Sequence, residues 1–599
     1  MRLANFESWI VAVLLVFTGA MSCSKDEHKR ASAAAKAELR QGQPVVAIVD
    51  SGNRISRHAN LDPRWPRYDP GSTSDHPYEM VALPGETVAF QVVVAAADES
   101  LDDVTIDCSN FPVIDGKTKS SCDIFLVYEI PMQRRSGGRH RDESLGWSSK
   151  SKPEAEIPPT TIADPLIPIS LAPAWATYPS RVASQSLQAF WIDVRIPEAG
   201  NFSKTPRGTL KVQARDRLLA SIPLNITVGE AALPFAAAKT MLYFDPEEIL
   251  GRTGTGESID AYLHLIHRHG ISSVFPVNSR EDVIRNSRYF SGTLFSEAQG
   301  YIGAGANRPA DLIAIGTYGS MGEPNDQSLA RVEEILTELE HLGRRAVPGT
   351  CDIFLYAIDE QCASPRGKLW RQALDASGSE RLRQLRVGHT CSDPPDRQGV
   401  DLVMMEASAY ASVHTLGAQR ARKQVWVYNG ALPKTGTFLT DSPTLSLTAN
   451  AWIQADYGIE RWFYWESTFW NDNNRGGRGP YDPFATAETF HNQDGDYCNG
   501  DGVLVYPGRQ LQFPKHDLAT TEVIPSIRLK QWRRGIQDAG YIALARRMDP
   551  TATERVIRQV LGGGFKTAFH RYDVPWQGDA DTFLKARVAL FNIISHAPH

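Results

Sequence analysis

The chain has 599 residues and a formal net charge of -6 at pH 7. Because single hydrophobic cores stop growing at about 250 to 300 residues, this length predicts two or three domains. Lysine and arginine do not cluster into a basic stripe, so the charge argues against a nucleic-acid partner. An uncharged substrate is compatible with this composition.

Residues 1–23 have the pattern of an export signal. Arg2 precedes an apolar run over residues 9–17, and small residues then lead to Cys23. The run is too short for a comfortable membrane span. Cleavage before Cys23, with lipid attached to its thiol, would resemble a bacterial lipoprotein, although Ala20 stands where a branched aliphatic residue is usual. We expect an exported cell-envelope protein that meets the membrane only through this lipid, with plain secretion or a retained anchor as alternatives.

The polar, alanine-rich residues 24–43 predict a flexible tether. Of the seven cysteines, six remain as an even set if Cys23 is lipidated, in a compartment that permits disulfides. Cys108 and Cys122 flank a predicted turn and are the expected pair. The others are too dispersed to pair from sequence and are Cys351, Cys362, Cys391 and Cys498. No zinc-type CxxC spacing occurs, so neither a metal nor a cofactor is expected.

Residues 44–234 have the patterning of an antiparallel β-sandwich. Short runs alternate apolar and polar residues and are divided by proline and glycine. The clearest runs are residues 87–94, 124–128, 188–194 and 208–213. No stretch of helical period interrupts them.

After Pro234 the pattern changes to strands that alternate with amphipathic helices, which predicts a parallel sheet. There are about eight strand candidates, the number that closes a (β/α)8 TIM-type barrel, here over residues 235–548. They are residues 240–245, 271–277, 312–317, 353–360, 385–389, 402–406, 425–429 and 462–466. Apolar residues at helical spacing lie between them over residues 259–269, 329–342, 369–374, 413–422 and 445–457. The second and fifth crossovers are poorly defined by the pattern.

A glycine-, aspartate- and asparagine-rich stretch, residues 471–507, follows the eighth strand. Its length indicates either a functional loop or a disordered one. A helix is predicted over residues 525–548. Residues 549–599 are predicted to be a helical extension, with helices over 554–561 and 582–595, that closes the bottom or side of the barrel.

Carboxylates stand at the ends of predicted strands, where a barrel of this type keeps its chemistry. Asp359 and Glu360 end the fourth strand, Glu406 the sixth, Glu466 the eighth and Asp245 the first. Two adjacent acids after seven mostly apolar positions are hard to justify structurally, whereas for Asp245 an ordinary role such as a helix cap is the preferred interpretation. Because carboxylates carry out glycosidic bond cleavage, the pattern predicts a glycoside hydrolase.

Two mechanisms are open. A retaining enzyme with two carboxylates holds its acid and nucleophile about 5 to 5.5 Å apart, which would pair Glu360 with Glu466 or Glu406. In substrate-assisted hydrolysis the sugar's own 2-acetamido oxygen attacks the anomeric carbon, Glu360 is the general acid and later base, and Asp359 holds the acetamido N–H. Adjacent acids suit the second scheme, with burial or the neighbouring charge tuning Glu360. A glycan-binding surface lipoprotein without catalysis is a third alternative.

Aromatic and amide side chains near the strand ends are candidate substrate contacts. Trp465 and Trp470 could form flat walls against the apolar C–H faces of a sugar ring. Tyr428 and Asn429, at the end of the seventh strand, could donate to or accept from the acetamido carbonyl or a sugar hydroxyl, with a structural role equally open.

Three histidines, His264, His267 and His269, lie close together in the sequence. They decorate an amphipathic helix and lack an acid motif such as HExxH. We therefore expect a solvent-exposed helix face there rather than a metal site.

Residues 499–508 and 525–538, the segment Leu355-Tyr-Ala-Ile-Asp-Glu360, and residues 85–91 and 163–168 together resemble glycoside hydrolase family 123. This family is β-N-acetylgalactosaminidase-like and is related to the domain of unknown function family 4091, whose C-terminal signature the first two segments resemble. The resemblance implies a β-sandwich with a TIM barrel and exo-acting, retaining removal of terminal β-linked N-acetylgalactosamine. It also implies substrate assistance through the 2-acetamido group, with Asp359 and Glu360 as the catalytic dyad.

The sequence departs from the family pattern at several positions. Arg534 replaces an aspartate, Gln537 a glutamate, and Ala539-Gly540 a tyrosine and glutamate, while Gln361 follows the dyad where proline is common. Most of these positions lie on a predicted helix. They leave the exact sugar open.

Overall fold

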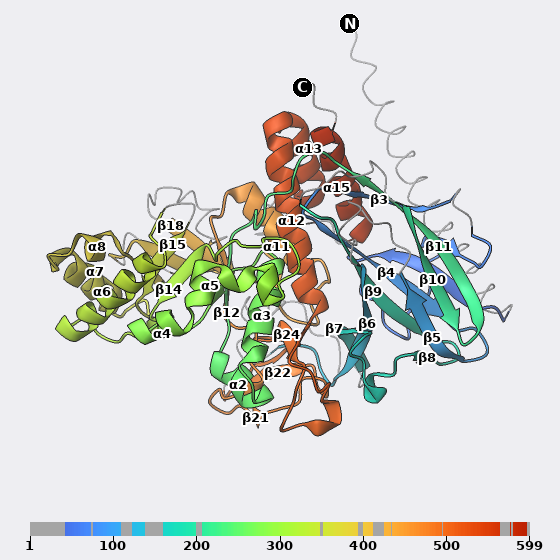
Figure 1. The fold of residues 1–599 in the computed structure, drawn as a ribbon, viewed down its shortest axis with the longest axis horizontal. Helices are drawn as coiled ribbons and strands as arrows, with labels where there is room; N and C mark the ends of the chain where they lie inside the picture. Colours follow the sequence, from blue (N-terminus) through green and yellow to red (C-terminus); the bar gives the residue numbers. More distant parts are fainter. Residues whose placement is uncertain are drawn as a thin grey trace, which may run out of the picture.

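The computed structural model describes residues 42–72, 76–108, 122–137, 160–198, 207–347, 351–392, 399–410, 424–432, 434–493, 495–562, 576 and 579–595. The predicted signal peptide with Cys23, nearly all of the tether and the helix predicted over 413–422 lie outside these ranges. Figure 1 shows a barrel-like part and a β-rich part on opposite sides of one long helix, α12. Among the described residues, no helix has the length and apolarity needed to cross a bilayer.

The N-terminal part consists of two sheets. The first has the order β2 (Arg67–Tyr68), β1 (Val45–Asp50), β4 (Thr87–Ala95), β9 (Leu187–Arg195), β6 (Cys122–Met132) and β7 (Thr160–Pro168). The second has the order β3 (Tyr78–Ala82), β11 (Arg217–Val228), β10 (Arg207–Ala214), β5 (Leu101–Asp107) and β8 (Ser180–Val182). Neighbouring strands are antiparallel except β3 and β11, which pair in parallel. Phe90 and Phe190 of the first sheet and Ile222 of the second belong to one core, as in a sandwich.

Eight parallel strands form the third large sheet, so all eight predicted strands are present. In chain order they are β12 (Thr240–Tyr243), β13 (Ser273–Val274), β14 (Leu312–Ile315), β15 (Asp352–Tyr356), β16 (Arg386–Thr390), β17 (Leu402–Glu406), β18 (Gln424–Tyr428) and β19 (Trp462–Tyr464). Their order in the sheet is β13-β12-β19-β18-β17-β16-β15-β14. The two end strands contact each other, although no ladder joins them in the described part of the chain, so the barrel is nearly closed. Its interior is filled by side chains such as Met241, Phe354, Met404, Trp426 and Phe463.

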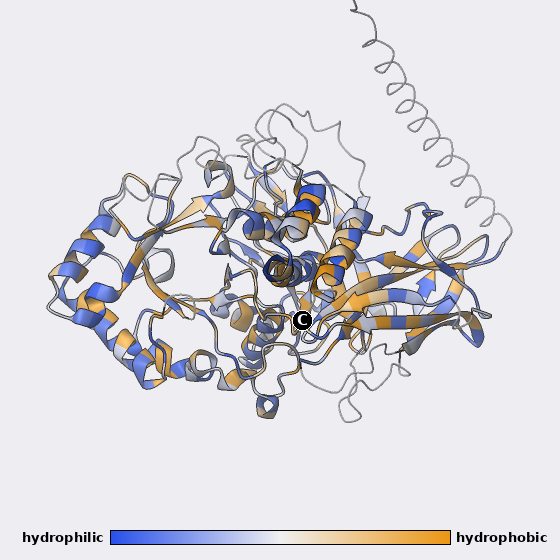
Figure 2. Cartoon of the chain, turned by 90° about the horizontal axis from the view of Figure 1, so that it is seen from above, coloured by the Kyte–Doolittle hydropathy of each residue, from blue (hydrophilic) through white to orange (hydrophobic). Residues whose placement is uncertain are grey.

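Helices lie outside this barrel, and Figure 2 shows that many of their residues are hydrophilic. They are α2 (Pro246–Thr253), α3 (Glu257–Arg268), α4 (Arg280–Arg285), α5 (Ser287–Ser291), α6 (Asp326–His341), α7 (Arg366–Ala376), α8 (Glu380–Gln384) and α11 (Ser446–Tyr457). The poorly defined second crossover contains the short α4 and α5. In the fifth crossover, the described residues contain no helix.

The histidines at the end of α3 contradict the expectation of an exposed face. His267 and His269 are buried. The His267 ring stacks on Phe295 with ring centroids 3.6 Å apart, and its Nδ1 lies 2.7 Å from the Tyr301 hydroxyl. Burial lowers the pKa of His267 to about 3, so this ring is neutral at physiological pH. The predicted helix is present as α3, but Phe295 and Tyr301 pack over the face that carries His267.

The segment predicted as a loop, residues 471–507, contains several short strands joined by turns. It contains β20 (Asn471–Asp472), β21 (Gly479–Pro480), β22 (Glu488–His491), β23 (Tyr497–Asn499) and β24 (Val505–Pro507), and β24 pairs with β25 (Val523–Pro525). In Figure 1 this segment lies below the barrel and beside the sandwich. The disordered alternative is therefore excluded for the described residues of this segment.

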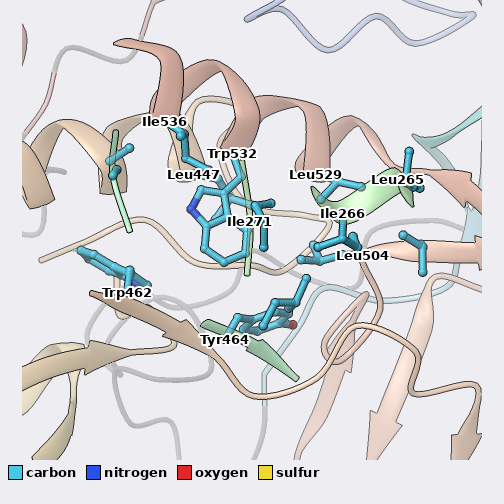
Figure 3. Packing of buried hydrophobic residues seen from close by; sticks show 14 of the residues in the cluster. Leu265, Ile266, Ile271, Leu447, Trp462, Tyr464, Leu504, Leu529, Trp532 and Ile536 are labelled. Carbon is cyan, nitrogen blue, oxygen red and sulfur yellow. The ribbon is translucent and has the colours of Figure 1, made fainter. Parts of the chain in front are cut away.

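Helix α12 (Ile527–Met548) joins the two large parts. Figure 3 shows Leu529, Trp532 and Ile536 packed on the barrel side, near Trp462 and Tyr464. Ion pairs hold the opposite face of the helix to the sandwich. Both faces of the helix are buried, so it has no solvent stripe in its first three turns.

Buried ion pairs connect α12 to the sandwich. Lys530 Nζ and an Arg533 guanidinium nitrogen each lie 2.7 Å from the Asp193 carboxylate, and Arg534 lies 2.6 Å from Asp50. Although burial opposes ionisation, Arg533 and Lys530 hold the pKa of Asp193 well below its usual range. Arg534, one of the departures from the family pattern, thus has a structural partner in this chain.

The C-terminal extension packs mainly on α12. Helix α13 (Pro550–Leu561) also contacts the barrel helix α11, as predicted for the side of the barrel. Helix α15 (Ala580–Ser595) instead contacts the sandwich strands β1 and β3, which corrects the prediction for this segment. Arg587 of α15 pairs with Glu86 of the sandwich and with Asp538 of α12.

The cysteines form two disulfides among the described residues. The predicted Cys108–Cys122 pair is confirmed. A second bond joins Cys362 and Cys391, which the sequence could not pair. Cys351 and Cys498 are buried free thiols, so the even set is not fully bonded.

Candidate active site

Asp359 and Glu360 follow β15 and line one cavity of about 370 Å³. Thr390 at the end of β16, Tyr428 at the end of β18 and Trp465 just after β19 line the same cavity. The site therefore lies at the carboxyl ends of the barrel strands, as predicted. Glu360 is exposed to this opening. Its exposure corrects the expectation that burial would tune this acid.

Asp359 is held by two hydroxyl groups. Thr390 Oγ1 donates to Asp359 Oδ1 over 2.5 Å, and the Tyr356 hydroxyl donates to the same oxygen over 3.0 Å. Tyr356 is the last residue of β15 and is fully buried, so its ring is a rigid support. Because both donors use Oδ1, Oδ2 is the oxygen that can meet a ligand.

Glu360 is fixed through its backbone and its side chain. Its φ of 48° lies in the left-handed region, which is uncommon for a residue with a side chain. Its N–H donates to Thr390 Oγ1 over 2.8 Å, and the Tyr428 hydroxyl donates to Glu360 Oε1 over 2.9 Å. Burial, reinforced by the Glu360 charge, raises the pKa of Tyr428, so this hydroxyl keeps its proton.

Asn429 also has a left-handed backbone, with a φ of 55°. Its N–H donates to the Phe463 carbonyl over 2.8 Å, and its own carbonyl accepts from Trp462 Nε1 over 2.7 Å. Within the described structure, its buried side-chain Oδ1 has no hydrogen-bond partner. A cavity-lining oxygen in that state suits a sugar hydroxyl or an amide N–H of a ligand.

The opposite wall combines Trp465 with residues that the sequence interpretation missed. Asp501 Oδ1 accepts from Trp465 Nε1 over 3.1 Å and from the Tyr464 hydroxyl over 3.0 Å, and burial raises the pKa of Asp501. Asn474 and Phe490, both from the segment after β19, line the cavity as well. The one signal for Asp501 was its place inside the segment 499–508, which resembles the family signature.

Two predicted contacts lie outside the cavity lining. Glu466 is buried, and its Oε1 accepts hydrogen bonds from the backbone N–H groups of Ser467 and Thr468 and from the Thr468 hydroxyl. Trp470 is fully buried, and its Nε1 donates to the Val505 carbonyl over 3.0 Å. Strand β19 ends at Tyr464 and the chain then turns into the body of the protein, so we assign neither side chain a contact with the sugar.

The two remaining strand-end carboxylates also lie outside the lining. Glu406 ends β17 and is paired in register with Tyr428. Asp245 is the N-cap of α2, where its Oδ1 accepts from the Glu247 N–H over 2.9 Å. The helix-capping interpretation of Asp245 is therefore confirmed.

Comparison with known proteins agrees with this geometry. Residues 389–545 match the family described as Glycoside hydrolase 123, catalytic domain. This match starts after the Asp359–Glu360 pair and includes Thr390, Tyr428 and Asp501. The resemblance to family 4091 stays a prediction. No match was found among curated protein sequences.

The fold is similar to that of a solved glycoside hydrolase. A family 123 glycoside hydrolase from Clostridium perfringens, analysed for glycolipid glycan hydrolysis, has a TM-score of 0.59 and 11% identity, over 92% of this chain and 98% of that chain. A family 39 enzyme from Bacteroides cellulosilyticus WH2 has a TM-score of 0.26 and 10% identity, over 66% and 80% of the two chains. A Bacteroides ovatus GH5 xyloglucanase has a TM-score of 0.24 and 10% identity, over 76% and 98%. The first of these shows a shared overall fold.

Proposed function

We propose that the protein is an exo-acting, retaining glycoside hydrolase that removes terminal β-linked N-acetylgalactosamine. The observation that carries this proposal is that Asp359 and Glu360, adjacent just after one barrel strand, open together into one cavity. Its volume, about 370 Å³, falls in the usual range for small-ligand sites, about 300 to 1,000 Å³. The family match over residues 389–545 supports the reaction class.

The proposed mechanism is substrate-assisted. As the 2-acetamido oxygen attacks the anomeric carbon, Glu360 gives its proton to the leaving oxygen, and a bicyclic oxazolinium-like intermediate forms. Glu360 then takes a proton from the water that opens this intermediate, so that the product keeps the β configuration. Asp359 accepts the acetamido N–H at Oδ2 and stabilises the positive charge. Intramolecular attack of this kind reaches effective molarities of about 10⁵ M or more.

The structure supports this scheme better than the one with a protein nucleophile. Glu466 lies outside the cavity lining, and its Oε1 is already the acceptor of three hydrogen bonds. Glu406 is also outside the lining. Asp359, by contrast, is adjacent to Glu360, and among the described residues no donor contacts its Oδ2.

The proposal also covers the natural substrate and the location of the protein in the cell. The similar enzyme from Clostridium perfringens is described with glycolipid glycans, which makes the glycan of a glycolipid a reasonable first substrate to test. We propose export and attachment through lipidated Cys23, as the sequence predicts. Mass spectrometry of the protein from membranes of an expressing bacterium tests that attachment, since an unmodified Cys23 would contradict it.

Hydrolysis of p-nitrophenyl β-N-acetylgalactosaminide is the direct test. We expect turnover by the wild type, and a fall in kcat of about 10²- to 10⁴-fold in Glu360→Gln and in Asp359→Asn. Asp245→Asn, which keeps a good helix cap, is the matched control and should keep full activity. Inhibition by a thiazoline mimic of the intermediate would support substrate assistance. Comparable turnover of p-nitrophenyl β-galactoside, which lacks the acetamido group, would contradict it.

A further inference from the structure

We infer that Thr390 is the positioning residue for the Asp359–Glu360 pair and that the Cys362–Cys391 disulfide holds Thr390 and the pair in register. This inference rests on the proposed function of the same site. Thr390 ends β16, the strand next to β15, so it stands beside the point where the dyad leaves its strand.

The Thr390 hydroxyl is engaged by both members of the dyad. It donates to Asp359 Oδ1 over 2.5 Å and accepts from the Glu360 N–H over 2.8 Å, and the Tyr356 hydroxyl, whose single proton is shared with Asp359 Oδ1, lies 3.2 Å away. The one proton of Thr390 is therefore committed to Asp359, and the Glu360 N–H occupies one of its two acceptor lone pairs. Although Thr390 lines the cavity, it is only 1% exposed. Its role is therefore to orient the two acids rather than to touch the sugar.

The backbone conformation of Glu360 requires such support. A left-handed φ at a residue with a side chain costs free energy and persists only when the surroundings determine it. The hydrogen bond from the Glu360 N–H to Thr390 is a contact that determines it here. One hydroxyl thus orients the carboxylate of Asp359 and the backbone of Glu360 together.

The Cys362–Cys391 disulfide joins the two segments that form these hydrogen bonds. Cys362 lies two residues after Glu360, and Cys391 directly follows Thr390. Their Cα atoms are 5.3 Å apart, and the bond joins the loop after β15 to the end of β16. The bond limits how far the loop that carries the dyad can move from the end of β16, so it helps to keep Thr390 within hydrogen-bond distance of the dyad.

The second disulfide provides a matched control. Cys108 and Cys122 are joined in the sandwich, where Cys122 begins β6 and Cys108 directly follows β5. Cys391 directly follows the cavity-lining Thr390, whereas the Cys108–Cys122 bond joins strands β5 and β6 of the sandwich. Removing it should affect stability without affecting catalysis.

The test is steady-state kinetics of the full exported chain on p-nitrophenyl β-N-acetylgalactosaminide. We expect Thr390→Val to lower kcat about 10- to 100-fold, the loss for hydrogen bonds to a charged group, with KM changed less than about threefold. Thr390→Ser keeps the hydroxyl and should restore kcat to within about threefold of the wild type. A purely packing role would predict the reverse order, because valine matches the shape of threonine better than serine does.

The disulfide is tested with Cys362→Ala/Cys391→Ala and with reductant. A phosphine such as TCEP cleaves the Sγ–Sγ bond, leaves two thiols and is itself oxidised to the phosphine oxide with oxygen from water. We expect kcat to fall at least about fivefold on reduction and in the double variant. Cys108→Ala/Cys122→Ala should keep the wild-type kcat and the wild-type response to TCEP.

Several results would overturn the inference. A wild-type kcat in Thr390→Val, or equal kcat losses in the two disulfide variants, would do so. If the wild type shows no hydrolysis, the proposed function fails, and calorimetric binding of the thiazoline inhibitor decides the positioning role separately. In that case tighter binding by Thr390→Ser than by Thr390→Val supports the inference, and equal binding refutes it.

Discussion

Replacing Glu466 with glutamine tests whether this carboxyl is a buried structural acid or the nucleophile of the alternative mechanism. The Glu466 side chain is 5% exposed, and Oε1 accepts three hydrogen bonds. Burial raises its pKa from 4.5 to about 8, so the folded protein holds it as the neutral acid near pH 7. Glutamine copies the shape and neutrality of that acid.

The sign of the pH effect follows from the raised pKa. Between pH 4.5 and 8 the folded protein keeps a proton on Glu466 that the unfolded chain has released. The stabilisation is therefore fully present below about pH 4.5 and is lost as the pH rises to about 8. The difference between 8 and 4.5, at about 1.36 kcal/mol per pKa unit, corresponds to about 5 kcal/mol. Because glutamine does not titrate, the stability of Glu466→Gln does not change with pH through this position.

The assay is urea unfolding of the wild type and Glu466→Gln at several pH values from 5 to 9. From pH 5 to pH 9, we expect the free energy of unfolding of the wild type to fall by about 4 kcal/mol relative to that of Glu466→Gln. Glu247→Gln, at an exposed carboxylate in the first turn of α2, is the control and should track the wild type. Glu466→Gln should also keep kcat within a few-fold. Parallel stability curves, or a loss of kcat by several powers of ten, would refute this reasoning.

Three further predictions concern the site and the interface between α12 and the sandwich. Tyr428→Phe removes the donor to Glu360 Oε1 and should lower kcat about 10-fold in the p-nitrophenyl assay; an unchanged kcat would show that the hydrogen bond is not used. Trp465→Ala should raise KM about 2- to 10-fold through loss of an aromatic wall, and an unaltered KM would exclude stacking on the sugar. Asp193→Ala leaves Lys530 buried without its ionic partner and should reduce the free energy of unfolding by about 3 to 5 kcal/mol, seen as a lower urea midpoint; a midpoint like that of the wild type contradicts it.

The barrel strands could be predicted because buried parallel strands are short, nearly continuous apolar runs. Each of the eight runs contains a strand in the structure, and the acids of the fourth run emerge at the edge where the cavity lies. Tyr428 and Asn429 were located for the same reason, because they end the seventh strand. Candidate residues that are positioned by strand ends alone could thus be predicted from the sequence.

The other half of the site depends on tertiary folding. Glu466 and Trp470 come after a barrel strand, as Glu360 does, but the chain turns inward after Tyr464 and buries both. Asp501 reaches the cavity from a segment with no periodic pattern. The Cys362–Cys391 bond joins positions 29 residues apart, and no local pattern specifies such a pair.

The burial of charge along α12 has a consequence for how this protein could be divided. Arg528, at the start of that helix, donates to the Asp164 carboxylate of the sandwich and to backbone carbonyls of the barrel part, including those of Phe438 and Gly500. If either part were produced alone, it would expose buried polar groups whose hydrogen-bond partners lie in the other part. Truncation at the apparent domain boundary should therefore give insoluble fragments, and the sandwich is better regarded as a permanent wall of the enzyme than as an exchangeable accessory module.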